Sequence, residues 1–268
     1  MSQPLISGID FWGRYRQRIE TVLLEALIIL KQEKDLSKDE VNINLRLFLC
    51  FKKACYRLGY DDMLPVPEGQ NPPYGRARKN EPYLKKRPDF YWHKVDLTEP
   101  DEEFSDRRYC LECKRLGTPE RADRVFNYDY FEKGISRFIS EEHKYGLGND
   151  VGGMLGYIQD TSPEDILTEV NNTLTLVDLP VLSGPTEGWQ SNGTSRLVHV
   201  LIRSFPKQPF TLHHFWIDLR ELFQNGSFQT EVRAKNSSDT GEETSSKVIR
   251  QPRRRRTVKE TNKAIEHK

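Results

Sequence analysis

The chain has 268 residues, of which 36% are hydrophobic and 30% charged, and its formal net charge is +1. This length and composition predict a soluble globular protein with one substantial core. They exclude a membrane-spanning protein, because the apolar stretch at residues 22–30 is too short to cross a bilayer and is flanked by charges. Residues 1–10 lack a basic segment followed by an apolar stretch, so we expect a cytoplasmic protein with reduced thiols and no membrane partner.

Charges are unevenly distributed along the chain. Acidic residues gather at 99–106 and 239–243, whereas other regions are basic. A net charge near zero therefore does not exclude binding to a polyanion.

A helix is predicted to begin close to residue 37. Ser37 and Asp39 are capping residues, and Gly59 is expected to end the helix. The positions that recur at helical spacing are Val41, Leu45, Phe48, Leu49, Lys52 and Cys55.

Two strands are predicted next, at about 88–96 and 106–115, with residues 97–105 turning the chain between them. Pairing Asp96 with Asp106 in an antiparallel hairpin would place Asp89 opposite Cys113. Strand alternation puts Glu112 and Lys114 on one face, so Asp89 is expected beside both. The acidic loop would lie at the far end of the hairpin, away from this cluster.

The clustered carboxylates indicate a cation site. Two carboxylates a few ångströms apart share a proton or hold a cation between them. An oxygen ligand set favours Mg²⁺, and the Cys113 backbone carbonyl would add one more oxygen to Asp89 and Glu112. Lys114 would then orient or polarise the attacking water and stabilise the charge that develops on a phosphate.

The segments Pro88-Asp89 and Glu112-Cys113-Lys114 resemble the two halves of the motif of the PD-(D/E)XK, or restriction-endonuclease-like, nuclease superfamily. The resemblance covers about residues 36–160. It implies an α/β fold with a mixed central β-sheet flanked by helices, and cleavage of DNA or, less often, RNA with Mg²⁺, for which Mn²⁺ would substitute. It also implies Asp89 and Glu112 as metal ligands and Lys114 as the catalytic lysine.

Many members of that superfamily carry a glutamate on the first helix close to the metal. Glu40, with Asn44 one turn later, matches this position best and would reach the metal directly or through a water molecule. Glu20 and Glu25, on an earlier predicted helix, are competitors for this role.

The surrounding pattern agrees with the resemblance. An amphipathic helix at 130–139 and a buried strand at 153–158 complete the order helix, hairpin, helix, strand. A basic segment with Tyr74 and Tyr83 precedes Asp89 and predicts contact with a nucleic-acid backbone, although a solvated loop would have the same composition. Its basic residues are Arg76, Arg78, Lys79, Lys85, Lys86 and Arg87.

The remaining chain predicts an extension of the same domain and a tail. A helix begins at 162–167, a loop covers 182–195, and strands at 196–204 and 210–219 are expected to extend the sheet, or to form a hairpin that binds a partner. We expect one nuclease domain at 1–234, with its core at about 36–160 and an extension at 161–234. Residues 235–268 are expected to be disordered. Within them Arg253, Arg254, Arg255 and Arg256 would either contact phosphates or keep a tail solvated.

The four cysteines do not indicate a zinc site. Cys110 and Cys113 have a Cys-x-x-Cys spacing, but on a strand this spacing directs them to opposite faces. We expect them to be small buried residues, together with Cys50 and Cys55.

The sequence therefore predicts a magnesium-dependent nuclease, with DNA endonuclease activity in a bacterial restriction, repair or anti-phage defence system as the first hypothesis. A non-catalytic module of the same fold that binds nucleic acid or protein, and an RNA-directed nuclease, are the alternatives. No phosphate-binding loop or helicase motif is present, so a sensor or motor protein would be a separate chain. Cutting both strands of a duplex would favour a homodimer, because one site cuts one strand.

Overall fold

The computed structural model describes residues 11–71, 73–76, 80–118, 125–183, 189–205 and 209–224. The predictions for Arg78 and Lys79, and those for the tail with its four arginines, fall on residues outside these ranges. Within the described ranges, no helix is both long enough and apolar enough to cross a membrane.

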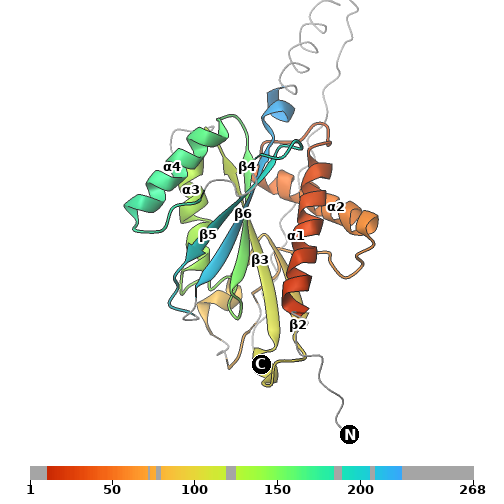
Figure 1. The fold of residues 1–268 in the computed structure, drawn as a ribbon, viewed down its shortest axis with the longest axis vertical. Coiled ribbons are helices and arrows are strands. Elements are labelled where there is room, and N and C mark those ends of the chain that lie inside the picture. Colours follow the sequence, from red (N-terminus) through yellow and green to blue (C-terminus); the bar gives the residue numbers. More distant parts are fainter. Residues whose placement is uncertain are drawn as a thin grey trace, which may run out of the picture. The chain divides into compact units, whose positions relative to one another are not determined.

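A six-stranded mixed sheet forms the centre of the fold (Figure 1). The strands lie in the order β1-β2-β3-β4-β6-β5, with β3, β4 and β6 parallel to one another and the other neighbours antiparallel. Their bounds are Val66–Pro67 for β1, Phe90–Val95 for β2, Asp106–Leu116 for β3, Val151–Ile158 for β4, Thr194–Leu201 for β5 and Phe210–Asp218 for β6. The expected α/β class is confirmed, and the last two strands extend the same sheet as predicted.

Helices cover both faces of the sheet (Figure 1). On one face α1 and α2 pack over one hydrophobic core, and on the other face α3 and α4 pack over a second one. The helices are α1 Phe11–Leu30, α2 Glu40–Leu58, α3 Phe126–Glu132 and α4 Pro163–Leu176, and the short 3₁₀ helices are η1 Pro82–Lys85, η2 Glu102–Phe104 and η3 Ile135–Phe138. Strand β3 contributes to both cores, because Cys113 faces the first and Cys110 the second. All four cysteines are free and buried, as expected.

Helix α2 begins and ends where the sequence indicates. The Asp39 side chain accepts from the Asn42 backbone N–H at its start, and Gly59 ends it in the left-handed conformation with φ +69°. The positions whose spacing predicted the helix do not form its buried face, however, since Val41, Leu45 and Leu49 are 60%, 61% and 45% exposed. The buried residues are Ile43, Leu47, Cys50, Phe51, Ala54 and Cys55.

The predicted hairpin register is wrong by one residue. Val95, not Asp96, pairs with Asp106, and Phe90 pairs with Leu111. The Asp96 carboxylate instead accepts from Thr98 in the loop and from Arg107 on β3, and β2 ends at Val95. Asp89 lies just before β2.

The helix predicted at 130–139 begins earlier and is interrupted. Helix α3 ends at Glu132, and a separate 3₁₀ helix, η3, begins at Ile135. Gly134 lies at the break, where a Cβ atom would collide with the Tyr130 carbonyl oxygen and the Met154 side chain. The chain therefore turns here and carries η3 along the sheet face. The predicted strand and helix that follow are present as β4 and α4, the latter capped by Ser162.

Candidate active site

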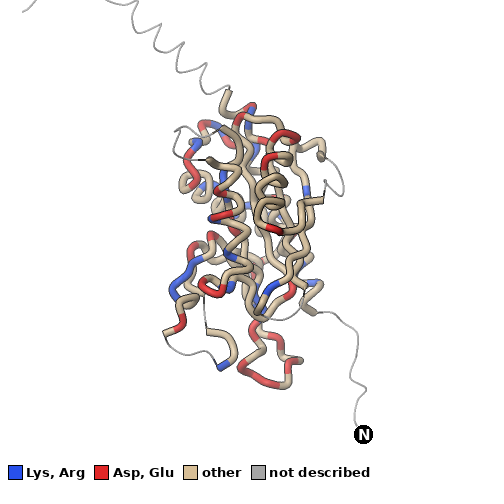
Figure 2. Tube along the Cα trace, turned by 90° about the vertical axis from the view of Figure 1, so that its left-hand side faces the viewer, with Lys and Arg blue, Asp and Glu red and all other residues tan. Residues whose placement is uncertain are grey.

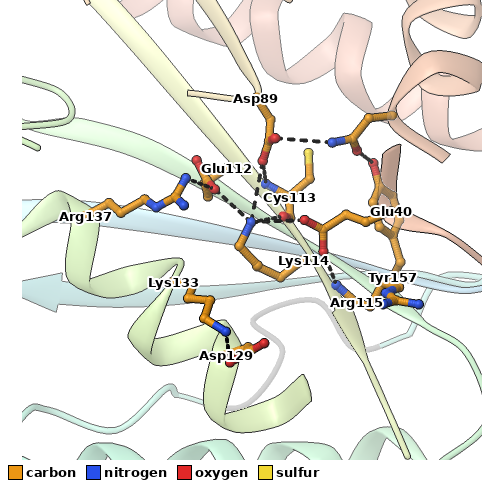
Figure 3. A network of polar contacts seen from close by, with 11 residues as sticks. Glu40, Asp89, Glu112, Cys113, Lys114, Arg115, Asp129, Lys133, Arg137 and Tyr157 are labelled. Atoms are coloured by element: carbon orange, nitrogen blue, oxygen red, sulfur yellow. Dashed lines mark hydrogen bonds and ion pairs between the residues drawn. The ribbon is translucent and has the colours of Figure 1, made fainter. Parts of the chain in front are cut away.

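Four residues that the sequence singled out lie together at one end of the β2–β3 hairpin (Figure 3). Glu40 is the first residue of α2, and Asp89 immediately precedes β2. Glu112 and Lys114 alternate with Cys113 along β3, so both point to the same face. The four residues come from α2, the start of β2 and β3, so residues up to 74 positions apart in the sequence lie close together.

The Lys114 ammonium is the centre of this cluster. Its Nζ lies 2.8 Å from Glu112 Oε1, 3.2 Å from Glu40 Oε1 and 3.8 Å from Asp89 Oδ2. It also donates to the Cys113 carbonyl oxygen at 2.6 Å. Burial opposes the charge, but the three carboxylates outweigh it and raise the pKa of Lys114 above its ordinary value. The lysine therefore stays protonated and acts as a cation.

Asp89 is held by two amide donors. The Cys113 backbone N–H donates to its Oδ2 at 2.6 Å, and the Asn44 side-chain amide donates to its Oδ1 at 3.3 Å. The Tyr157 hydroxyl donates to Asn44 at 2.7 Å and so fixes the orientation of that amide. Burial and the nearby Glu112 charge raise the pKa of Asp89 to about 7 in spite of these donors. A cation beside Asp89 would favour the ionised carboxylate and lower this pKa.

Glu112 is fully buried and only half satisfied. Its Oε1 accepts from Lys114 and forms an ion pair with Arg137. Its Oε2 is buried and has no hydrogen-bond partner. An unpartnered carboxylate oxygen in the interior is unfavourable by a few kcal/mol, which makes it a ready acceptor for a cation or a donor.

The donor set fits a hard divalent cation. Within the described ranges, no group of three or more His, Cys, Asp or Glu side chains is placed to hold a metal ion as the side chains stand. Lys114 Nζ lies between the Glu40 and Glu112 carboxylates. Asp89, Glu112 Oε2 and the Cys113 carbonyl are oxygen donors on adjacent backbone positions of a hairpin. Mg²⁺ needs only one or two carboxylates when waters and phosphate oxygens complete its shell.

Glu40, rather than its competitors, reaches the cluster. Its second carboxylate oxygen accepts from the Arg115 backbone N–H at 3.2 Å, so both of its oxygens are engaged by donors. Glu20 instead pairs with His213 at 2.7 Å, and Glu25 pairs with Arg57 at 2.9 Å.

The basic segment before Asp89 is partly committed to other contacts. Arg76 pairs with Glu103 at 3.2 Å, and Lys86 pairs with Glu142, whereas Lys85 and Arg87 are exposed. The two tyrosines expected beside these residues are packing groups. The ring of Tyr83 is buried, and Tyr74 packs edge-on against Phe104 with 5.5 Å between centroids. The Tyr83 ring is therefore not free to stack on a base.

The acidic loop lies away from the cluster, as the sequence predicted. It connects the far ends of β2 and β3, whereas the cluster lies where β2 begins and β3 ends. Figure 2 shows the acidic residues of this loop gathered at the lower end of the tube. A polyanion that approached the cluster would not have to pass them.

The structure adds residues that sequence reasoning did not assign to the site. A cavity of about 140 Å³ opens beside Lys114, and Arg137 of η3 and Lys133 after α3 line it. Arg115 on β3 and Asp129 on α3 line it as well. Helical periodicity marked this region as amphipathic, and Arg137 lies after the break at Gly134, where it pairs with Glu112.

Comparison of the chain with protein-family models, with curated proteins and with solved structures found no match. The geometry of the cluster and the motif residues within it are what indicate a function.

Proposed function

We propose that this chain is a metal-dependent nuclease with a restriction-endonuclease-like fold, and that Asp89, Glu112 and Lys114 form its active site. The convergence of three carboxylates and one backbone carbonyl on the Lys114 ammonium carries the proposal. The order of elements supports it, since a helix, an antiparallel hairpin, a helix and a parallel strand follow one another as α2, β2–β3, α3 and β4.

The proposed reaction adds water across a P–O bond of nucleic acid and leaves a phosphate monoester and a hydroxyl. Asp89, Glu112 and the Cys113 carbonyl would hold Mg²⁺, or Mn²⁺ in its place, and Glu40 would approach it through water. When bound, the ion would supply Lewis-acid stabilisation of the charge on the phosphate. The unpartnered Glu112 Oε2 and the raised pKa of Asp89 are the features that fit such an ion.

Lys114 has an electrostatic role in this proposal. It would stabilise the developing negative charge and orient the attacking water. Arg137 would hold Glu112 in position, and Asn44 would do the same for Asp89.

The test is incubation of the purified protein with supercoiled plasmid, linear duplex DNA, single-stranded DNA and RNA, in Mg²⁺, Mn²⁺ or EDTA. We expect cutting that depends on the metal, and we expect Asp89→Asn and Lys114→Met to reduce its rate by about 100-fold or more. Lys52→Ala removes an exposed lysine from α2 and should cut like the wild type. The substrate that is cut decides between DNA and RNA.

Cutting that persists in EDTA, or wild-type rates in both active-site variants, would contradict the proposed site. The absence of cutting on every substrate would contradict nuclease activity of the isolated chain and favour the binding module.

A further inference from the structure

The cavity beside Lys114 is bounded by charged groups from several elements. Its volume is about 140 Å³, which holds a tetrahedral oxyanion together with water, because one water molecule occupies about 30 Å³ of liquid. Four cations line it, and they are Lys114, Arg115, Lys133 and Arg137. Two carboxylates, Glu40 and Asp129, also line it, so the cations exceed the anions by two. Phe126 contributes the apolar part of the wall.

Three of the four cations have fixed partners. Lys114 is held by the carboxylate cluster, and Arg137 pairs with the buried Glu112. The Arg115 guanidinium lies 4.2 Å from the centroid of the Phe126 ring and donates to the Lys38 carbonyl at 3.2 Å. The carboxylates beside Lys114 and Arg137 offset those two charges, and all three side chains have little freedom to follow a ligand.

Lys133 differs from the other three. Its side chain is 53% exposed, and it pairs with Asp129 one helical turn earlier at 2.9 Å. The Asp129 side chain is only 10% exposed, whereas the Lys133 ammonium has three N–H donors on an exposed side chain. An anion in the cavity could therefore compete with the Asp129 carboxylate for Lys133. Figure 3 shows this pair facing the Lys114 side of the site.

We propose that this cavity binds a phosphate group of the nucleic-acid strand next to the phosphodiester that is cut, and that Lys133 contacts that phosphate directly. The inference rests on the proposed nuclease function, because the cavity shares Lys114 and Glu40 with the proposed active site. The phosphate group is either an internal phosphodiester, as an endonuclease would bind, or a terminal monoester at a strand end.

The test measures binding in EDTA, so that cleavage is not required. Fluorescence anisotropy of a labelled single-stranded oligonucleotide, with a 5′-phosphate or a 5′-hydroxyl, would give Kd over a range of salt concentrations. We expect Lys133→Ala to weaken binding about 3- to 10-fold and to reduce the slope of log K against log salt by about 0.7, which corresponds to one phosphate contact. Lys52→Ala is the matched control and should leave both values unchanged.

Asp129→Asn separates phosphate binding from a structural role of the ion pair. It removes the carboxylate that competes with phosphate for Lys133, so we expect it to tighten binding, opposite in sign to Lys133→Ala. A purely structural pair would make both variants change binding in the same direction or leave it unchanged, and either result would overturn the proposal.

The two forms of the oligonucleotide identify the kind of phosphate. A preference for the 5′-phosphate that disappears in Lys133→Ala would support a terminal monoester, whereas an equal loss for both forms would support an internal phosphodiester. An unchanged slope in Lys133→Ala, or no binding by the wild type, would overturn the proposal. Normal phosphate binding without any cleavage would instead contradict the nuclease function and leave the cavity assignment intact.

Discussion

Among single residues, Asp89 is the clearest case of a carboxylate whose surroundings disfavour the ionised form. Burial and the Glu112 carboxylate raise its pKa to about 7, whereas an aspartate in an unfolded chain ionises near pH 4. The folded protein therefore retains a proton on Asp89 that the unfolded chain has released. By linkage, the free energy of unfolding falls as pH rises from about 4 to about 7 and stays lower above that range.

Because burying the Asp89 charge is unfavourable, we expect Asp89→Asn to stabilise the fold while it removes activity. Asn has nearly the same shape and no charge to bury, and its side-chain oxygen can still accept from the Cys113 N–H. Its amide nitrogen would then face the Asn44 amide, which reduces the gain. We expect the free energy of unfolding at pH 8 in EDTA to rise by about 2 kcal/mol, measured by urea denaturation. At pH 4, where Asp89 is already neutral in the folded protein, the two proteins should differ much less.

The same variant also tests whether Asp89 binds Mg²⁺. A cation held by Asp89 and Glu112 should raise the thermal midpoint of the wild type and should not raise that of Asp89→Asn. A variant less stable than the wild type at pH 8 would show that the Asp89 charge is well accommodated, contrary to this account.

At the scale of elements, α2 presents apolar residues on two sides. Ile43, Leu47 and Phe51 recur at the same helical spacing as Val41, Leu45 and Leu49. The first set is buried because Phe51 packs edge-on against Phe90 and Trp92, at centroid distances of 5.2 and 5.5 Å. Periodicity alone could not choose between these faces.

A pair of leucine variants tests this assignment. Leu47→Ala removes a fully buried side chain, and we expect it to lower the free energy of unfolding by about 2–4 kcal/mol. Leu45→Ala makes the same chemical change on the exposed face and should stay within about 0.5 kcal/mol of the wild type. Chemical denaturation of both variants gives the comparison, and equal losses would mean that the second face is covered as well.

The candidate site shows which parts of a fold local sequence determines. Strand alternation correctly placed Cys110 and Cys113 in different cores, and it put Glu112 and Lys114 on one face, because the strand period is 2. The hairpin register was wrong by one residue, since the side-chain contacts of Asp96 in the loop decide where β2 ends. The contact of Arg137 with Glu112 was not predictable, because it joins two elements whose relative position depends on tertiary packing and not on local sequence.

For the molecule as a whole, two buried histidines join the end of the sheet to the helix layer. His199 on β5 and His214 on β6 have ring centroids 5.7 Å apart, and both side chains are almost completely inaccessible. His214 Nδ1 lies 2.8 Å from the hydroxyl of Tyr130 on α3. Burial lowers the pKa of His199 to about 4, and burial together with the neighbouring histidines lowers that of His214 well below its ordinary value.

Protonation of this pair should destabilise the entire fold, because the rings lie between elements and cannot reach water without opening the core. The unfolded chain takes up these protons near pH 6.5, whereas the folded protein resists them until about pH 4 at His199, so the free energy of unfolding falls as pH decreases through that window. Across this window the shifted pKa of His199 alone should lower the free energy of unfolding by about 3 kcal/mol.

Urea denaturation between pH 7.5 and 4 tests this. We expect His199→Leu to lose less stability on acidification than the wild type. Both proteins contain Asp89, so its effect cancels when one curve is subtracted from the other. His93→Gln removes a half-exposed histidine that lies 3.3 Å from Asp106, and it should differ from the wild-type curve by less than about 1 kcal/mol. If His199→Leu lost as much stability as the wild type over this range, the acid sensitivity would have to arise from groups other than this histidine.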